Sequence, residues 1–365
     1  MDGSRDVPGR VPPVRLSRRA RVAVLGAYGV VAAAVVTDVL TGPRSTLSPL
    51  LAAVPVLAST GTRRVLVPLL AGAVSVLLVG ALAVDNPDVA TVVHATSAAT
   101  VLAVTVTSAA TVALVAARER ELTDVRNVAE AAQRALLRPV ASRIGRVRIA
   151  VRYRAAAAEA RIGGDVYEAM TTPYGVRLLL GDVQGKGLPA VETAADVLGV
   201  YREAARAEPD LAVVAGRIDA ALVRRPVCED FVTAVLVTVP LDDAPVVVVN
   251  CGHPPPMLRR DGRVSEVEPP GHAPPLALLT LAGGGYRARP LALPDGGTLL
   301  LYTDGVSEAR DAGGRFYPLA ERLAALPAAD PDALLDALLA DVDRHTGGRL
   351  ADDVAVLALC RTGRG

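Results

Sequence analysis

Hydrophobic residues are unevenly distributed along this chain of 365 residues, and its two parts differ in character. Through roughly the first 120 residues Val, Ala and Leu dominate and charges are few, whereas apolar runs then alternate with charged segments as in a globular domain. The chain is longer than one typical domain. This contrast predicts an N-terminal membrane region followed by a separate folded domain.

Four apolar stretches follow one another in the first part, at residues 22–40, 47–58, 65–84 and 92–117. A hydrocarbon core about 30 Å thick needs about 20 helical residues, which the first, third and fourth stretches provide. The second is short and contains Pro49 and Pro55, so it either crosses the membrane or forms a re-entrant or interfacial piece. A cleavable signal peptide fits the first stretch poorly, because the stretch is long and lacks a small-residue cleavage site.

The charges between these stretches favour four crossings over three. The loop before the third stretch carries Arg63 and Arg64, the loop of residues 85–88 carries two acids and no base, and six arginines precede residue 22: Arg5, Arg10, Arg15, Arg18, Arg19 and Arg21. Positively charged loops stay in the cytoplasm. We therefore expect residues 1–21 to be a cytoplasmic basic tail and residues 22–117 to form four transmembrane helices in contact with lipid. Both termini would then lie on the cytoplasmic side of a bacterial cell membrane.

Residues 118–138 predict a helical connector, because the segment is charged and has no Gly or Pro before Pro139. Five apolar residues recur in it at 3-4-3-4 spacing, the pattern of a short two-helix coil: Leu122, Val125, Ala129, Ala132 and Leu136. Two interpretations stay open. The helix either pairs with a second copy to form a signalling homodimer, or packs its apolar stripe on the domain that follows.

Residues 139–365 predict a domain of mixed strands and helices. β-Branched and aliphatic runs predict strands over residues 147–154, 176–180, 231–239, 246–250, 298–302 and 354–360. Helices are predicted over residues 188–207, 210–224, 319–326 and 331–345. Because the strands cluster in adjacent pairs, the fold class expected is α+β, with largely antiparallel sheets flanked by helices.

Composition excludes several classes of function. The net charge is +1, Trp is absent and Phe occurs twice, so neither the basic stripe nor the stacking aromatics of a nucleic-acid-binding surface is present. Cys228, Cys251 and Cys360 lie far apart and form no C-x-x-C pair, which argues against a zinc knuckle or a disulfide framework. The cysteines fit a reducing cytoplasm best.

Four aspartates stand beside glycine or at predicted strand ends: Asp165, Asp182, Asp304 and Asp352. A single Asp-Gly pair is commonly a hairpin turn, but four such acids in one domain need something to offset their mutual repulsion. Ligand sets made only of oxygen favour Mg²⁺ or Mn²⁺ over zinc. Two ions about 3.5 to 4 Å apart activate a water and clamp a phosphoryl group, which indicates phosphate-ester hydrolysis without a covalent enzyme intermediate.

Two competing motifs fail at particular positions, and a third feature, His253, stays open. Residues 181–187 (G-D-V-Q-G-K-G) are one residue short of a P-loop, and Gly187 stands where a Ser or Thr would bind magnesium. Cys251 and Arg259 have the wrong spacing for a Cys-x5-Arg phosphate cradle. His253 could donate a proton, although a Gly-His-Pro turn is more often structural.

Seven motifs, taken in order, resemble the bacterial SpoIIE/RsbU group of metal-dependent type 2C protein phosphatases: residues 133–139 (Q-R-A-L-L-R-P), 163–165 (G-G-D), 181–187, 231–234, 252–255 (G-H-P-P), 302–308 (Y-T-D-G-V-S-E) and 352–353 (D-D). The resemblance covers about residues 130–360. It implies a sandwich of two antiparallel sheets flanked by helices. It also implies a serine/threonine phosphatase that uses two Mn²⁺ or Mg²⁺ ions and acts on a phosphorylated anti-sigma factor antagonist.

The same resemblance ranks the acids by their expected roles. Asp182 corresponds to the aspartate that bridges the two metals, and the carbonyl of Val183 corresponds to the adjacent backbone ligand. Asp165 corresponds to the acid that supports the second metal through water. Asp304 and Asp352 correspond to ligands of the first metal, with Asp353 the less certain carboxylate; Asp182 and Asp304 are thus the residues expected to be essential for catalysis.

Lys186, between Gly185 and Gly187, is the only lysine in the chain and lies in the loop after the bridging aspartate. It would screen the acids or contact phosphate, or simply be a solvated loop residue. Gln184 and Ala355 depart from the family pattern, but neither removes a ligand. An active enzyme is therefore expected, the alternative being a membrane receptor or scaffold whose phosphatase-like domain binds a phosphoprotein with little turnover.

Overall fold

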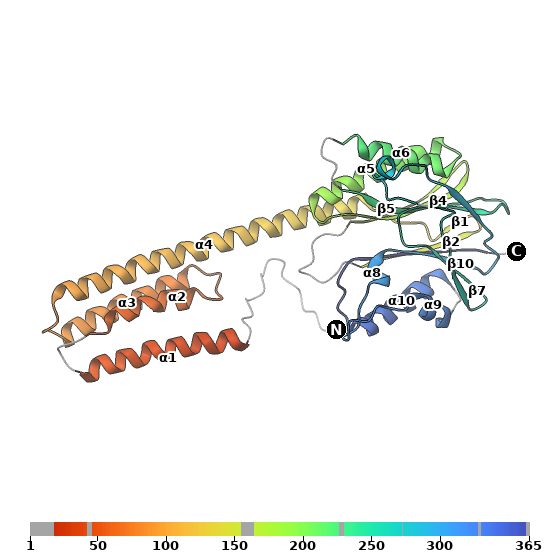
Figure 1. Ribbon diagram of the computed structural model, residues 1–365. Helices are drawn as coiled ribbons and strands as arrows, with labels where there is room; N and C mark the ends of the chain where they lie inside the picture. The colour runs from red at the N-terminus through yellow and green to blue at the C-terminus, as the bar shows by residue number, and fades with distance from the viewer. Residues whose placement is uncertain are drawn as a thin grey trace, which may run out of the picture. The chain divides into compact units, whose positions relative to one another are not determined.

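The computed structural model describes residues 18–41, 46–154, 164–225, 230–271, 273–327 and 330–362, so Gly163 and Cys228 lie outside the described residues. The chain forms two compact units, Met1–Asp124 and Val125–Gly365. Helix α4 belongs to both, because it runs without interruption from Thr91 to Leu136 (Figure 1). The boundary between the fourth apolar stretch and the connector, placed at residue 117 from the composition, is therefore not a break in structure.

In its described residues, the N-terminal unit consists of helices joined by short turns and loops. Its elements are α1 (Arg18–Thr41), η1 (Ser48–Ala52), α2 (Ala53–Ser59), α3 (Leu66–Asp85) and the first part of α4. Two helices, α3 and α4, are long and apolar enough to cross a membrane, and 28% of the residues in the apolar window of each are buried within the protein. The apolar helices at residues 24–40 and 48–59 are shorter. Four crossings thus stay a prediction.

The residues of the predicted coiled-coil seam differ in burial along α4. Leu122 and Val125 are 57% and 50% exposed, whereas Ala129 is fully buried and Leu136 packs against the core of the C-terminal unit. The interpretation that the stripe packs on the following domain is therefore confirmed for the end of the helix.

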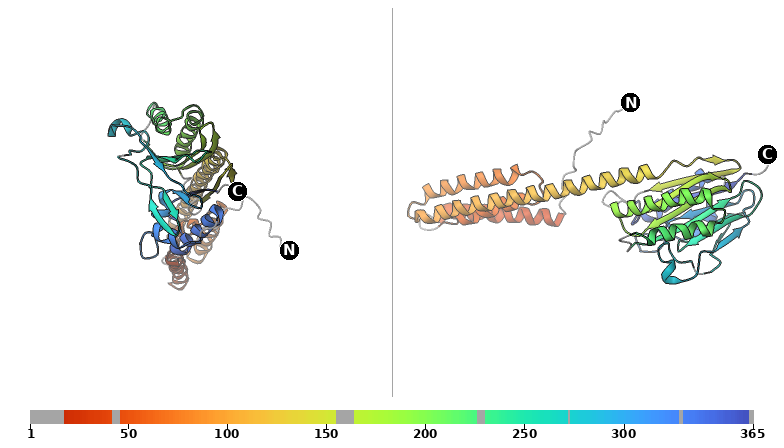
Figure 2. Two further views of the ribbon diagram at one scale, coloured as in Figure 1. Left: turned by 90° about the vertical axis from the view of Figure 1, so that its right-hand side faces the viewer. Right: turned by 90° about the horizontal axis from the view of Figure 1, so that it is seen from above.

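The C-terminal unit consists of two antiparallel sheets with helices outside them, which confirms the predicted fold (Figures 1 and 2). One sheet has the order β1-β2-β11-β10-β7-β8 and the other β3-β4-β5-β6-β9. The strands are β1 (Arg143–Ile144), β2 (Val147–Arg154), β3 (Asp165–Thr172), β4 (Gly175–Val183), β5 (Val232–Val239), β6 (Val246–Cys251), β7 (Met257–Arg260), β8 (Arg263–Glu266), β9 (Ala288–Leu291), β10 (Thr298–Tyr302) and β11 (Val354–Arg361).

The helices cover the outer faces of the two sheets. They are α5 (Leu188–Ala207), α6 (Leu211–Val223), α7 (Leu279–Ala282), α8 (Asp304–Ser307), α9 (Leu319–Ala325) and α10 (Pro331–Thr346). Helices α5 and α6 lie side by side against the sheet containing β4 (Figure 2), and α9 and α10 pack on the sheet containing β10. All four predicted helices are present within a residue or two of their expected bounds.

Runs of leucine form the middle strands because both faces of these strands are buried. On β4, Leu178 and Leu180 enter the core between the sheets while Leu179 packs beneath α5 and α6. On β10, Leu299 and Leu301 enter the same inner core and Leu300 packs against the layer of α9 and α10. Side chains alternate across a strand, so an unbroken apolar run is what a strand inside a four-layer domain requires.

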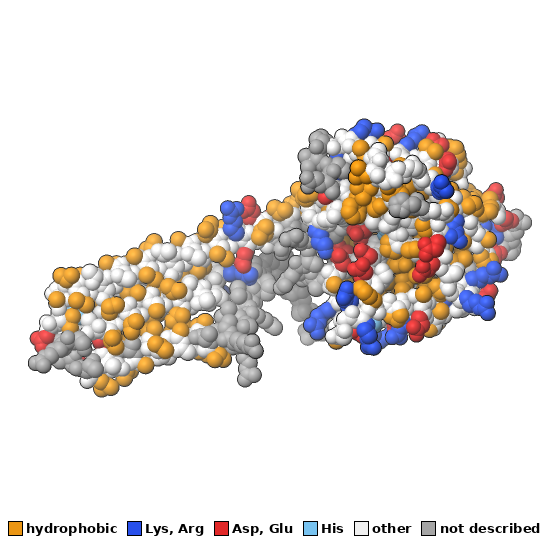
Figure 3. All heavy atoms as spheres, in the orientation of Figure 1, with side chains coloured by type: hydrophobic (Ala, Val, Ile, Leu, Met, Phe, Trp, Pro, Cys, Tyr) orange, Lys and Arg blue, Asp and Glu red, His pale blue; other side chains and the backbone are white. Residues whose placement is uncertain are grey.

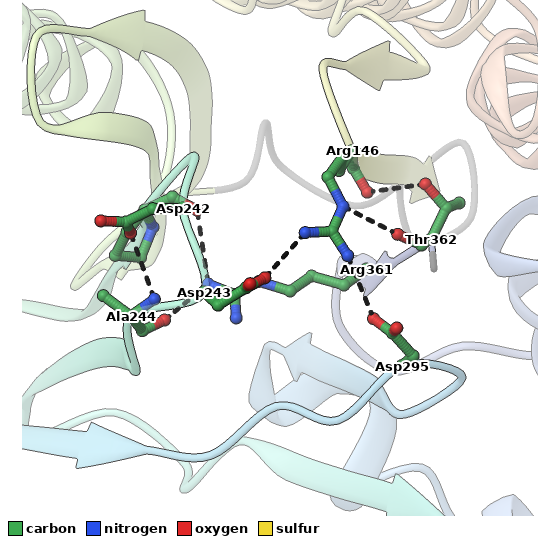
Figure 4. A network of polar contacts seen from close by, with 8 residues as sticks. Arg146, Asp242, Asp243, Ala244, Asp295, Arg361 and Thr362 are labelled. Atoms are coloured by element: carbon green, nitrogen blue, oxygen red, sulfur yellow. Dashed lines mark hydrogen bonds and ion pairs between the residues drawn. The ribbon is translucent and has the colours of Figure 1, made fainter. Parts of the chain in front are cut away.

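One end of the sandwich is closed by a network of polar contacts (Figure 4). Arg146, in the turn before β2, donates to the Thr362 carbonyl at 3.2 Å and to Asp243 at 2.8 Å, and pairs with Asp295 at 3.6 Å. The buried Arg361 donates to the carbonyls of Pro240 and Ala244 in the β5–β6 loop. Because Arg361 ends β11, whose first residue follows Asp353, this network lies at the far end of the strand from the acids.

Candidate metal centre

The predicted acids come together from both sheets. Asp165 on β3 lies directly opposite Asp182 on β4 in the antiparallel register. Asp304 is the first residue of α8, just beyond the end of β10, and Asp352 and Asp353 immediately precede β11. All five line one cavity of about 580 Å³. Figure 3 shows acidic side chains gathered over the region of α8 on the face toward the viewer.

Two glycines bring the backbone close to these acids. A Cβ at Gly164 would lie 2.1 Å from the carbonyl oxygen of Val183 and 2.8 Å from Oδ1 of Asp182. A Cβ at Gly305 would lie 1.8 Å from the carbonyl oxygen of Asp353. Real Cβ atoms essentially never come this close to another heavy atom. The glycines flanking the aspartates thus allow two chain segments to pack against ligand candidates, which no side chain would permit.

The clustered carboxylates raise one another's proton affinity. Burial, followed by the charges of Asp304 and Asp352, raises the pKa of Asp182 to about 7. Burial and the neighbouring Asp182 raise the pKa of Asp165 well above its ordinary value. Burial, with the charge of Asp352, also raises the pKa of Asp304. At neutral pH the protein alone therefore stabilises this set of charges poorly, and bound cations would relieve the repulsion.

Lys186 supplies one positive charge at the cavity. Its Nζ lies 2.7 Å from Oδ1 of Asp352, and hydrogen bonding to this carboxylate raises the lysine pKa. Gly185 and Gly187 on either side have φ of 98° and 85°, conformations that favour glycine, and together they shape the turn that carries the lysine over the acids. The sequence-based expectation that Lys186 lies beside the acidic cluster agrees with this position.

Two polar residues that the sequence did not identify as site residues, Thr303 and Tyr153, hold the acids in place. Thr303 donates to Oδ2 of Asp165 at 3.2 Å and accepts from the backbone N–H of Ala355 at 3.0 Å. The hydroxyl of Tyr153 donates to Oδ2 of Asp353 at 2.9 Å. Burial and the charge of Asp353 raise the pKa of Tyr153, so this hydroxyl stays protonated.

Helix α4 also contacts the Tyr153 hydroxyl, through Gln133. Gln133, in the last turn of α4, donates from Nε2 to the Tyr153 hydroxyl at 3.3 Å. Gln133 and Asp353 are both buried. A path of two hydrogen bonds therefore links the end of α4 to one of the candidate metal ligands.

The hydrogen bonds of His253 support a structural role, although the residue lines the cavity. Its Nε2 lies 3.0 Å from the carbonyl oxygen of Tyr302, which can only accept, so this nitrogen carries the proton and Nδ1 accepts from the Thr233 hydroxyl at 3.0 Å. Burial lowers the pKa of His253 to about 4. The ring is therefore neutral and already bonded at both nitrogens, which favours the structural interpretation of the Gly-His-Pro turn.

The donor set matches hard divalent cations. The described residues that line the cavity offer the carboxylates of the five aspartates and the carbonyl of Val183 as oxygen ligands, and none of these residues is a cysteine. Among the described residues, no three His, Cys, Asp or Glu side chains already converge on one point. The oxygen ligands themselves fit Mg²⁺ and Mn²⁺ better than zinc.

Comparison with known proteins places this geometry in a family context. Residues 172–362, more than half of the chain, match the family model described as Stage II sporulation protein E (SpoIIE). Among solved structures, the RsbU and RsbW domains of a Mycobacterium tuberculosis protein are 26% identical with a TM-score of 0.51, covering 60% of this chain and 61% of that chain.

Two further structures share the fold. The PP2C phosphatase domain of Bacillus subtilis SpoIIE with a fragment of its regulatory domain is 21% identical, with a TM-score of 0.53, covering 60% of this chain and 65% of that chain. The SiaA-PP2C domain of Pseudomonas aeruginosa is 22% identical with a TM-score of 0.57, covering 67% of this chain and 98% of that chain. The chain thus spans less than two thirds of the first two structures that it matches.

Proposed function

Because this chain belongs to the SpoIIE family, we propose that it is a metal-dependent protein phosphatase that hydrolyses phosphoserine or phosphothreonine on a regulatory protein. The observation that carries this proposal is the meeting of five aspartates in one cavity, where burial and mutual repulsion raise the pKa of Asp182 to about 7. Such a cluster is costly for the protein alone and suits paired cations.

The roles proposed for these residues are those that the resemblance to the SpoIIE/RsbU group implies, and all of the residues line the cavity. Asp182 would be shared by the two ions, with the carbonyl of Val183 beside it, and Asp304 and Asp352 would hold the first ion. Asp165 would support the second ion through water, with Asp353 as a further carboxylate. When bound, two such ions lower the pKa of a water and offset the charge of the phosphoryl group.

Other residues of the chain hold this set rigid. Thr303 fixes Asp165 and Tyr153 fixes Asp353 through the hydrogen bonds described above. Lys186 neutralises Asp352 and, from the rim of the cavity, contacts the phosphate of the substrate, with Gly185 and Gly187 setting the position of the loop. Outer groups of this kind commonly change metal affinity by 10- to 100-fold when they are removed.

An anti-sigma factor antagonist-like phosphoprotein is the substrate that we propose. Support comes from the family match and from the similarity to the RsbU-containing structure of M. tuberculosis. The seven motifs that resemble the SpoIIE/RsbU group agree with this assignment. The cavity is large enough to accept a phosphorylated side chain, since it has a volume of about 580 Å³.

The test is release of phosphate from a phosphoserine protein by the full chain in detergent, with and without Mn²⁺. We expect manganese-dependent turnover that Asp182→Asn abolishes. Tight binding of the phosphoprotein without turnover would favour the alternative of a receptor or scaffold. Equal turnover by the wild-type chain and Asp182→Asn would exclude the proposed site.

We also propose that the N-terminal unit crosses a bacterial cell membrane four times, with both termini in the cytoplasm and the apolar helix surface in contact with lipid. Support comes from the arginines before the first and third stretches and from the exposed apolar side chains of α3, such as Leu70 at 65% and Leu77 at 74%. Reporter fusions after residues 44, 63 and 88 test the topology. External signals at 44 and 88 with a cytoplasmic signal at 63 are expected, and a cytoplasmic signal at 44 would contradict four crossings.

A homodimer through α4 is the accompanying proposal. Leu122 and Val125 are the seam residues left exposed, so a second copy of the helix can cover them. In full-length protein, Leu122→Cys should form a disulfide-linked dimer on mild oxidation, whereas a cysteine at the opposite, exposed Thr123 should not. Equal cross-linking at both positions would speak against a defined seam.

A further inference from the structure

A short hairpin follows the acidic site along the chain. Helix α8 carries Asp304, Glu308 next to its end lines the cavity, and Arg310 comes two residues later. Two residues of extended chain span at most about 7 Å between Cα atoms. The Cα atom of Arg310 therefore lies within about 7 Å of the Cα atom of Glu308, at the rim of the cavity. There Arg310 pairs with Phe316 in an antiparallel β-bridge.

Arg310 and Phe316 form one exposed surface, which we call the Arg310–Phe316 platform. The guanidinium carbon of Arg310 lies 4.2 Å from the centroid of the Phe316 ring, and 53% of Phe316 is exposed. Within the part of the chain that the structure describes, Arg310 makes no ion pair. The chain has only two phenylalanines and no tryptophan, so it exposes one of its few large aromatic rings here.

The hairpin beneath the platform is held firmly. Asp311 accepts from the backbone N–H groups of Gly313 and Arg315 at 2.8 and 3.0 Å, closing the turn. Tyr317, the residue after Phe316, is buried and donates from its hydroxyl to Asp341 on α10 at 2.7 Å. Its backbone N–H also bonds the carbonyl of Ala309 at 2.8 Å.

A rigid, exposed aromatic ring beside an exposed arginine is the composition of an interface hot spot. Preorganisation matters, because side chains that are already ordered lose little entropy when a partner covers them. Stacking of Arg310 on Phe316 leaves the edge of the guanidinium free to pair with a carboxylate. The partner chemistry that fits is thus an apolar side chain next to an acidic one.

We infer that the Arg310–Phe316 platform is a docking surface for the phosphorylated protein substrate, and that it selects an apolar residue adjoining an acidic one at a short distance from the phosphoserine. The inference rests on the proposed function, since it needs the substrate's phosphate to enter the neighbouring cavity. Two observations choose the substrate as occupant: the platform continues directly from α8 at the cavity rim, and its positive charge complements an acidic segment.

Synthetic phosphoserine peptides test this directly with the full chain in detergent and Mn²⁺. One series carries adjacent Leu and Glu at each distance from one to six residues on either side, and the reference peptide carries Ala at both positions. For the wild-type chain, we expect one arrangement to raise kcat/KM about tenfold over the reference, which corresponds to about 1.4 kcal/mol. Phe316→Ala and Arg310→Ala should each remove this preference and leave hydrolysis of the reference peptide and of p-nitrophenyl phosphate unchanged.

Leu241→Ala is the matched control. Leu241 is 54% exposed, almost the same as Phe316, but it lies in the loop after β5, at the end of that strand away from Asp182. This variant should keep the peptide preference in full. A wild-type chain with no preference, or a preference kept by both platform variants, overturns the inference.

Binding separates this inference from the proposed function. The same peptides, labelled with a fluorophore, are titrated with the full-length Asp182→Asn variant with and without Phe316→Ala. Loss of the Leu-Glu preference on Phe316→Ala supports the platform even if the wild-type chain releases no phosphate. If Phe316→Ala changes only self-association of the chain, measured by sedimentation, the occupant is a second copy and the inference fails.

Discussion

Replacing Gly305 by alanine is a sharp test of how the acids are held together. Gly305 is buried in α8, immediately after Asp304, and the added Cβ would lie 1.8 Å from the carbonyl oxygen of Asp353. Since real Cβ contacts stay beyond 3.0 Å, the two segments must separate by about 1.2 Å. This moves Asp304 away from Asp352 and Asp353, and a shift of about 1 Å at a catalytic site can cost about 100-fold in rate.

The expected result for Gly305→Ala is a loss of about 100-fold in Mn²⁺-dependent kcat/KM, with unfolding free energy lowered by about 1 to 3 kcal/mol from overpacking. Gly199→Ala is the matched control, because Gly199 lies in α5 with no atom within 4 Å of the added Cβ. That change should leave activity intact and stabilise the helix by about 0.5 to 1 kcal/mol. Phosphate release and calorimetry measure both variants. A folded Gly305→Ala chain with wild-type activity would refute the reasoning.

Three further predictions concern the same domain. Burial, then the charges of Asp304 and its neighbours, raises the pKa of Asp182 from 3.8 to about 7, so the metal-free folded chain holds this proton more tightly than the unfolded chain. Its stability should fall as pH rises from about 4 to about 7, and calorimetry in EDTA should show a weaker dependence for Asp182→Asn. Tyr153→Phe removes the hydrogen bond to Asp353 and should weaken Mn²⁺ binding about tenfold by titration calorimetry. Arg361→Ala leaves two carbonyls of the β5–β6 loop without this donor and should lower the unfolding free energy by about 1 to 3 kcal/mol, with Mn²⁺ affinity unchanged.

The secondary structure was predictable where local pattern and burial agree. The leucine runs of β4 and β10 identified buried strands, and α5 has the bounds that its apolar periodicity predicts. Strand β3 escaped notice because Glu168 interrupts its apolar pattern. This side chain is buried all the same, paired with Arg202 on α5, and such a distant partner is invisible to periodicity.

The acidic residues of the site could be found from sequence, whereas the groups that hold them could not. Asp182 and Asp304 each end an apolar strand, so the local pattern identifies them. Tyr153 contacts Asp353 across 200 positions in the chain, and only the pairing of β2 with β11 brings the two together. Gln133 likewise reaches the site only because the end of α4 packs on the domain.

The same limit applies to the N-terminal half of the chain. Each of the four apolar stretches was predicted as a separate element, but α4 continues through the charged connector as one helix ending at Leu136. No Gly or Pro interrupts residues 91–136, so the backbone has no reason to break where the composition changes. A change from apolar to charged residues marks a change of surroundings rather than the end of a helix.

The most direct test of the proposed metal centre is the number of ions that the chain binds. Mn²⁺ is titrated into the metal-free full-length protein at neutral pH and followed by electron paramagnetic resonance, with Asp182→Asn in parallel. Two ions per chain, magnetically coupled through the shared Asp182 carboxylate and uncoupled or lost in Asp182→Asn, are expected. Binding of no Mn²⁺ by the wild-type chain, or an identical titration for the two proteins, would contradict a paired metal site at these aspartates.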